Sequence, residues 1–243
     1  MRFLIKFSYD GTHYAGFQRQ KGKDTIQERM EEALKIVNND QKTPIVATGR
    51  TDKGVHALSQ YGHADLSVKI TEKKLKRALN SHLPDDIHVM ETKEVEKDFH
   101  ARYYVKKKEY QYVLNRGEYN PLEKNYVFQY NYSLNVEEMK KAILYFLGEH
   151  DFRAFATDNK EKENCVREIT KAQIKEKGEK LIFTFEGTGF LRYQVRNMVG
   201  LLIKVGENKI KAEEVKSILE SKDRTKSGKT APACGLTLVK VTY

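Results

Sequence analysis

The chain has 243 residues, which is enough for one large domain or two smaller ones with a core of their own. It carries 44 Lys and Arg against 34 Asp and Glu, and the resulting net charge of +10 favours polyanionic partners such as nucleic acid. No apolar run approaches the roughly 18 residues of a membrane span, and the N-terminal segment 1–6 is too short for a signal peptide. We therefore expect no membrane partner.

The two cysteines, Cys165 and Cys234, stand alone, and the seven histidines lack the spacing of metal ligands. Gly187-Thr188-Gly189 is an incomplete dinucleotide fingerprint, and no GxxxxGK[ST] motif occurs. These patterns lead us to expect a reduced, cytoplasmic protein without a metal or other cofactor.

The first part of the chain alternates predicted strands and helices. Residues 2–9 alternate in polarity and predict a strand, and the polar loop at 13–20 is either solvated or lines an RNA site. Thr25 and Glu28 have the spacing of a capping box. The helix that follows has Ile26, Met30, Ala33, Leu34 and Val37 at buried positions. Further predicted elements are strands at 44–47 and 55–66, a helix from Thr71 to Pro84 with Leu75, Ala78 and Leu79 buried, and a strand at 87–95.

Residues 103–114 predict a longer strand. Residues two apart share a face of a strand, so one side would be both basic and aromatic. This side either faces RNA or belongs to an edge strand whose lysines discourage aggregation. Its members would be Tyr104, Lys106, Lys108, Tyr110 and Tyr112.

A turn-rich stretch at 115–124 indicates a division into an N-terminal half, 1–115, and a C-terminal half, 116–243. Strands and helices in both halves predict an α+β fold. The elements expected in the second half are a helix from Asn135 to Gly148, a charged loop at 158–164, strands at 166–176 and 180–187, helices at 190–205 and around 215–219, a basic loop at 222–229 and a strand at 235–243.

Arg192 and Arg196 are four residues apart in the predicted helix 190–205, so they would share a face that borders its apolar stripe. A guanidinium at such an edge needs a partner, because burying an unpaired charge costs several kcal/mol. A carboxylate or a phosphate would serve.

Between the predicted strands at 44–47 and 55–66 lies the segment 48–57, in which Asp52 stands between Arg50 and Lys53 and glycines bracket the group. Glycine allows tight turns, so the pattern predicts a loop that presents Asp52. Asp and Gly are also ordinary turn residues, and spacing alone does not separate the two interpretations.

The segment Gly49–Ala57 resembles the GRTDxGVHA signature of the TruA family of tRNA pseudouridine synthases. Six other segments resemble that family in the same order along the chain. They are Tyr9-Asp10-Gly11 through Gln18, Leu79-Asn80 with Leu83-Pro84 and Asp86-Ile87, Phe99–Arg102, His150-Asp151-Phe152 with Phe155, Val195–Gly200, and Ala231-Pro232-Ala233 with Gly235-Leu236.

The resemblance implies a role for five residues. Asp52 matches the catalytic aspartate, Tyr110 a tyrosine that stacks on the uracil, and Arg196 a cation that pairs with the aspartate. Arg50 matches an arginine that helps to displace the target base, and Leu236 an apolar residue that packs against the uracil.

The resemblance also implies a pseudouridine-synthase fold of two α/β halves with antiparallel sheets, with an active-site cleft between the halves. The expected protein is a homodimer that acts on tRNA, at positions 38–40 of the anticodon stem-loop. Isomerising uridine needs no oxidant and no energy source, in keeping with the expected absence of a cofactor. Ionised Asp52 would act at C6 of the base or at C1′ of the ribose.

Two other functions follow from the same residues. A catalytically silent RNA-binding protein or RNA chaperone would bind RNA without forming pseudouridine. A metal-dependent hydrolase built on Asp52 and His56 would need further ligands that the sequence does not offer.

Overall fold

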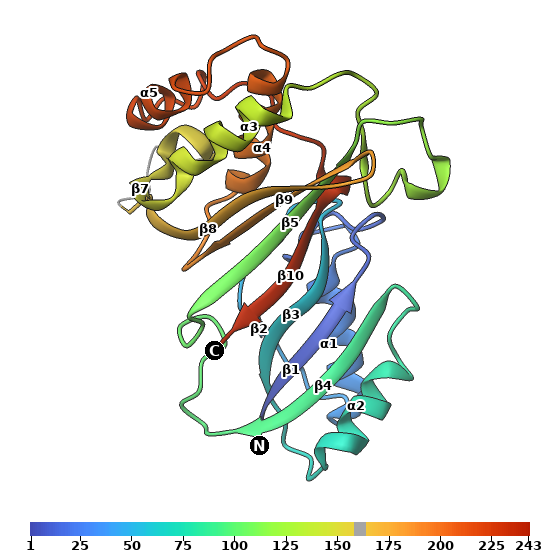
Figure 1. The fold of residues 1–243 in the computed structure, drawn as a ribbon. Helices are drawn as coiled ribbons and strands as arrows, with labels where there is room; N and C mark the ends of the chain where they lie inside the picture. Colours follow the sequence, from blue (N-terminus) through green and yellow to red (C-terminus); the bar gives the residue numbers. More distant parts are fainter. Residues whose placement is uncertain (158–163) are drawn as a thin grey trace. The chain divides into compact units, whose positions relative to one another are not determined.

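The computed structural model describes residues 1–157 and 164–243, so all but the last residue of the charged loop expected at 158–164 lies outside the described residues. The fold is α+β, as predicted, with mostly antiparallel strand pairs (Figure 1). The chain packs into two compact units. Unit 1 comprises Met1–Lys106 and Thr237–Tyr243, and unit 2 comprises Lys107–Leu236.

Unit 1 is built on a sheet in the order β4-β1-β3-β10. Strand β1 pairs antiparallel with both β3 and β4, and β10 runs parallel to β3. Side chains of β1 alternate between buried and half-buried, which is why its polarity pattern was readable. The strands are β1 (Arg2–Tyr9), β2 (Val46–Ala47, beside β3), β3 (His56–Asp65), β4 (Ile87–Val95) and β10 (Leu236–Thr242).

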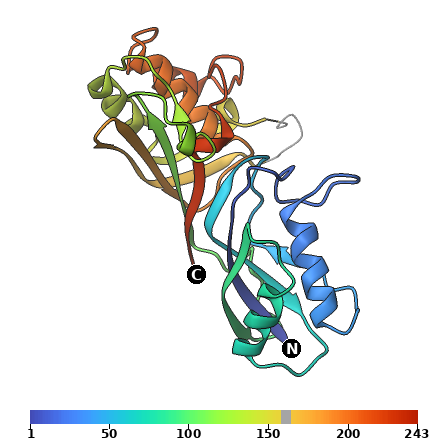
Figure 2. The ribbon, with the colours of Figure 1, turned by 90° about the vertical axis from the view of Figure 1, so that its right-hand side faces the viewer.

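Helices α1 (Ile26–Val37) and α2 (Glu72–Asn80) cover one face of this sheet (Figure 2). The Thr25 hydroxyl accepts the Glu28 N–H, which confirms the predicted N-cap of α1. The Thr71 side chain makes no such bond at the start of α2. The buried helix positions match the predicted ones except Val37 and Ala78, which are half-buried.

Within unit 2 the strands of the sheet follow the order β5-β9-β8-β7, with antiparallel neighbours. A short strand β6 runs parallel to β5. The turn between β8 and β9 uses Gly178 at φ +57°, and both strands lie where the sequence predicted them. The strands are β5 (Lys107–Asn115), β6 (Phe128–Gln129), β7 (Gly148–Asp151), β8 (Val166–Lys177) and β9 (Lys180–Gly187).

Three helices pack on one face of this sheet (Figure 1), and short 3-10 turns connect several elements. Helix α3 ends at Ile143 and passes into a 3-10 turn, rather than continuing to Gly148 as expected. Helix α4 begins at Gln194 instead of Phe190, because Tyr193 has the left-handed backbone angle φ +63°. The helices are α3 (Val136–Ile143), α4 (Gln194–Gly206) and α5 (Glu214–Glu220).

The strand predicted at 103–114 was wrong at its start, since β5 begins at Lys107. The N–H groups of Tyr103 and Tyr104 both donate to the His100 carbonyl, so this segment turns before the strand begins. Strand β5 packs within unit 2, although it falls in the predicted half 1–115, and β10 adds residues 237–243 to unit 1.

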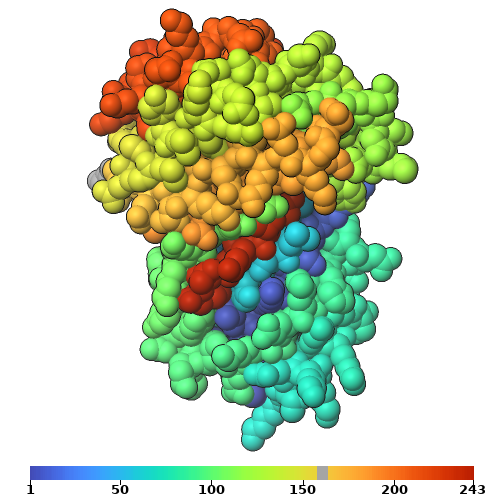
Figure 3. Space-filling model, viewed as in Figure 1, coloured from blue at the N-terminus to red at the C-terminus, as the bar shows by residue number. Residues whose placement is uncertain are grey.

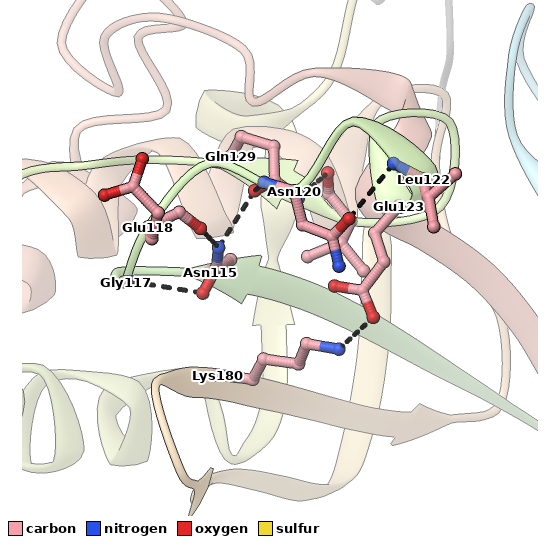
Figure 4. Close-up of polar contacts among 9 residues, drawn as sticks. Asn115, Gly117, Glu118, Asn120, Leu122, Glu123, Gln129 and Lys180 are labelled. Atoms are coloured by element: carbon pink, nitrogen blue, oxygen red, sulfur yellow. Dashed lines mark hydrogen bonds and ion pairs between the residues drawn. The ribbon is translucent and has the colours of Figure 1, made fainter.

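The connection from β5 to α3 is held by Asn115, which is 5% exposed (Figure 4). Its Nδ2 donates to the Glu118 carbonyl and to Gln129 Oε1, and its Oδ1 accepts the Gly117 N–H. The stretch that looked like a junction in the sequence is therefore an ordered part of unit 2.

No helix among residues 1–157 and 164–243 combines the length and the apolar character that crossing a membrane requires. Cys165 is buried and Cys234 is half-buried, and the two form no disulfide.

Candidate functional site

The signature segment forms a tight turn directly before β3. The Asp52 carbonyl accepts the Val55 N–H at 3.1 Å, and Gly54 adopts φ +76° within this turn. Asp52 is half-buried, whereas Arg50 and Lys53 are exposed. The turn therefore carries one carboxylate at the protein surface between two cationic side chains.

Thr51 anchors this turn from below. The residue is 8% exposed, its carbonyl accepts the Phe17 N–H at 3.0 Å, and its Oγ1 lies 2.8 Å from Tyr9 Oη. Burial raises the pKa of Tyr9 to about 12, so its hydroxyl stays protonated at neutral pH. The residue before Asp52 is thus held through both its side chain and its backbone.

The loop at 13–20 supports the turn instead of lying free in solvent. A Cβ on Gly11 would lie 2.0 Å from the Val55 carbonyl oxygen, and one on Gly16 would lie 3.0 Å from that of Thr51. Phe17 is 3% exposed and contacts the rings of Phe7 and Tyr9. The interpretation as a solvated loop is therefore wrong for its first half, because these close approaches place 11–17 against the signature turn. That the loop lines an RNA site stays a prediction.

His56 ties the end of the turn to the same loop. Its Nδ1 lies 3.1 Å from the Gly11 N and 3.0 Å from Asp10 Oδ1. The ring nitrogen either accepts the Gly11 N–H or carries its proton toward Asp10, and both arrangements hold the two segments together. This placement gives His56 a structural task within unit 1.

The beginning of the signature is fixed by β3 and by Tyr243. Thr48 Oγ1 donates to the Tyr61 carbonyl at 2.9 Å and lies 3.0 Å from Tyr243 Oη. Gln60, which is fully buried, donates from Nε2 to the Gly49 carbonyl at 3.1 Å. The turn is thus anchored at its start, beside Asp52 and at its end, as a preorganised site requires.

In unit 2, Tyr110 lies on β5 and is 8% exposed, with its ring edge-to-face against Phe190 at 5.1 Å. Tyr112, two residues on, is fully buried, and its hydroxyl donates to the Pro232 carbonyl at 3.0 Å. The predicted basic and aromatic face is therefore wrong at Tyr112, which is a core residue, and at Tyr104 and Lys106, which precede the strand.

Arg196 lies in the first turn of α4 and is half-buried. Its Nε donates to the Ala231 carbonyl at 2.8 Å, and its guanidinium lies 5.1 Å from the centre of the Tyr193 ring. Arg192 lies 5.1 Å from the same ring but precedes the helix. The two arginines are therefore brought together by Tyr193, and not by a shared helix face as predicted.

Leu236 is 5% exposed and follows a segment that lies directly on α4 and β5. A Cβ on Gly200 would lie 1.9 Å from the Lys229 carbonyl oxygen, and one on Gly235 would lie 2.7 Å from the Tyr112 ring. Burial raises the pKa of Tyr112 and of Cys234, and the positive charge of Arg196 partly opposes this rise at both groups. Arg196 and Leu236 thus belong to one packed region of unit 2.

The basic loop at 222–229 contains one arginine that faces inward. The Arg224 guanidinium donates to Ser227 Oγ, to the Gly228 carbonyl, to Asn197 Oδ1 and to Thr230 Oγ1. Burial lowers the pKa of Arg224. The charge of Arg224 therefore holds the loop against α4.

The predicted site residues therefore lie in two groups. Arg50 and Asp52 belong to unit 1, and Tyr110, Arg196 and Leu236 belong to unit 2. Their chemical roles stay predictions. Sequence reasoning assigned no role to Tyr9, Thr51, Gly11, Gly16 or Gln60, which hold the turn, because anchoring through long-range hydrogen bonds leaves no local pattern.

The sequence profile of the tRNA pseudouridine synthase family matches residues 5–104 and 142–243. A tRNA pseudouridine synthase A from Anoxybacillus flavithermus (strain DSM 21510 / WK1) is 43% identical over 242 residues, covering 100% of this chain and 98% of its own. That of Thermoanaerobacter sp. (strain X514) is 45% identical over 241 residues, covering 99% and 98%. That of Streptococcus pneumoniae serotype 19F (strain G54) is 43% identical over 245 residues, covering 100% and 98%.

Among solved structures, a chain titled as a Cbf5-Nop10-Gar1 complex aligns with a TM-score of 0.32 at 12% identity, over 83% of this chain and 54% of that one.

Proposed function

Because the chain belongs to the tRNA pseudouridine synthase family, we propose that it isomerises uridine to pseudouridine in tRNA, with Asp52 as the reacting carboxylate. The observation that carries the proposal is the turn around Asp52. A single carboxylate is held there between two exposed cations by anchors on both sides. Rigid support of this kind is what a nucleophile needs.

The reaction breaks the bond between C1′ and N1 of the uridine and forms one between C1′ and C5. N1 gains a proton, and the C5 proton leaves to solvent. The net change is an isomerisation, so no cofactor takes part. Ionised Asp52 begins the reaction either by adding to C6 of the base or by assisting its departure at C1′.

A uridine within or beside a stem must first leave the base stack, at a cost of a few kcal/mol. Arg50 fills the vacated space, and Tyr110 and Leu236 pack on the extruded base, which offsets this cost. Arg196 supplies a cation that favours the ionised form of Asp52. These four roles are those implied by the family resemblance.

The proposed target is positions 38–40 of the anticodon stem-loop, and the proposed working form is a cytoplasmic homodimer. Both parts are those implied by the family resemblance, and the full-length match to relatives named tRNA pseudouridine synthase A supports membership in that family. Pseudouridine mapping of tRNA after incubation with the protein tests the position, and sedimentation tests the dimer. Modification only elsewhere in tRNA, or a monomer at working concentration, would contradict them.

The Asp52→Asn variant tests the proposed nucleophile. It preserves the shape of the side chain and removes its charge, so tritium release from tRNA labelled at uridine C5 should fall by roughly 10²-fold or more. RNA binding should persist, because the turn is held through Thr51 and Val55.

Asp85→Asn makes the same chemical change at an exposed carboxylate of unit 1 and should leave the release unchanged. Undiminished release by the Asp52→Asn variant would remove Asp52 from the mechanism. RNA binding without pseudouridine in the wild-type protein would instead favour a silent RNA-binding protein.

A further inference from the structure

The connection between β4 and β5, residues 96–106, exposes two tyrosine rings. Tyr103 is 77% exposed and Tyr104 is 51% exposed. Arg102 and Lys106 beside them are also exposed. We propose that these four residues, here termed the tyrosine platform, bind an unpaired base of the RNA substrate and its flanking phosphates. This inference rests on the proposed function, and it adds a contact outside the residues already assigned to the reaction.

The exposed ring of Tyr103 is held in a fixed orientation. It stacks on His100 with ring centres 4.2 Å apart and planes inclined by 27°, and His100 in turn meets the edge of the buried His63 ring at 4.9 Å. A ring that is already fixed loses little conformational entropy when a ligand stacks on it, and an exposed aromatic face accepts any base.

The backbone under the platform is anchored independently of the exposed ring. Ala101 is fully buried, its N–H donates to His63 Nδ1 at 3.1 Å, and its carbonyl accepts from Tyr243 Oη at 3.1 Å. The Lys106 N–H donates to the Thr242 carbonyl at 2.8 Å, and the end of β10 lies at the surface next to this segment (Figure 3). Truncating the Tyr103 side chain should therefore leave the segment folded.

The charges at the platform favour RNA as its ligand. Neither the Arg102 nor the Lys106 side chain forms an ion pair or hydrogen bond with any residue in the described ranges 1–157 and 164–243. The negative charges of the nearby Asp65 and Asp98 act on Arg2, where they raise the pKa of its guanidinium, and Asp65 forms an ion pair with it at 2.7 Å. Two cations beside a fixed ring match a base and its phosphates.

The Tyr103→Ala variant tests the platform through the Kd for a tRNA transcript, measured by fluorescence anisotropy. The Kd should rise about 5- to 150-fold, the range that stacking on one base supplies, while kcat at saturating tRNA stays unchanged. Tyr103→Phe retains the ring and should bind as the wild type does. Arg102→Gln should reduce the slope of log Kd against log salt concentration by about one, because one phosphate contact is lost.

Tyr132→Ala provides the matched control, because this tyrosine of unit 2 is 71% exposed and lies outside the platform. It should leave Kd unchanged. Because Kd is measured without turnover, a weakened Tyr103→Ala variant supports the platform even if the wild-type protein forms no pseudouridine. An unchanged Kd of the Tyr103→Ala variant in an active protein would overturn the platform. If this variant kept its Kd but changed its sedimentation coefficient, the platform would also be overturned. The Tyr103 ring would then be assigned to contact with a second copy of the chain.

Discussion

At the scale of single residues, the Tyr9 hydroxyl supports the turn around Asp52. It lies 2.8 Å from Thr51 Oγ1, both residues are buried, and Thr51 precedes the proposed nucleophile. Removing the hydroxyl leaves the buried Thr51 oxygen without this partner, which costs about 1–3 kcal/mol. A small displacement of a reacting group also slows catalysis.

We expect Tyr9→Phe to lower the free energy of unfolding by about 1–3 kcal/mol and to reduce kcat several-fold, with little effect on KM. Urea denaturation and tritium release measure the two effects. Tyr130→Phe is the control, because its hydroxyl donates to Glu207 in unit 2. It should lose stability without losing kcat. An unchanged kcat in Tyr9→Phe would mean that the bond stabilises the fold without orienting Asp52.

At the scale of elements, the packing of α4 against residues 229–231 sets the positions of Arg196 and Leu236. The Ala231 N–H donates to the Arg196 carbonyl at 3.1 Å, and Arg196 Nε donates back to the Ala231 carbonyl at 2.8 Å. Gly200, one turn further along α4, permits this close approach, since any Cβ would meet the Lys229 backbone at 1.9 Å.

Gly200→Ala should therefore destabilise the protein by about 1–3 kcal/mol through overpacking, although alanine is the better helix former by about 1 kcal/mol. Pseudouridine formation should fall as well, because the added methyl group would push α4 away from residues 229–231 and so displace Arg196 and Leu236. Gly206→Ala on the same helix is the control. Its Cβ would meet the flexible side chains of Met139 and Leu134, which can shift. Equal thermal midpoints for the two variants would contradict this account.

At the scale of the whole molecule, the net charge of +10 governs association with RNA. The exposed side of α2 carries Lys73, Lys74 and Arg77, and these cations make no ion pairs within the described part of the chain. Each phosphate neutralised by such a cation releases counterions, so the affinity falls as salt rises.

We expect the Kd for tRNA to rise at least roughly tenfold between 50 and 200 mM salt, as is usual for proteins that make several phosphate contacts. Anisotropy titrations at several salt concentrations measure the slope. Replacing both Lys73 and Lys74 with Gln should reduce it, whereas Lys222→Gln should have less effect because Lys222 already lies 3.5 Å from Asp151. A Kd independent of salt would exclude an electrostatic association.

The amino-acid sequence alone determined the elements whose hydrophobic pattern is local. Strand β1, helix α1, strand β4 and the hairpin of β8 and β9 lie where periodicity and capping predicted them, because one face of each is buried in regular steps. The signature segment was also readable, because its glycines and charges are adjacent in the chain.

Tertiary structure alone decided which aromatic and cationic side chains are available to a ligand. Tyr112 was expected on a strand face that either meets RNA or lies at a sheet edge, but it is buried under the 231–235 segment. Arg224 was expected in a basic loop, but its guanidinium donates to Ser227 and Gly228 within the loop and to Thr230 and Asn197 outside it. Tyr103 was expected in a strand and instead lies exposed on His100. Pro232 and Asn197, the partners of Tyr112 and Arg224, are distant in sequence, and local pattern does not encode such contacts.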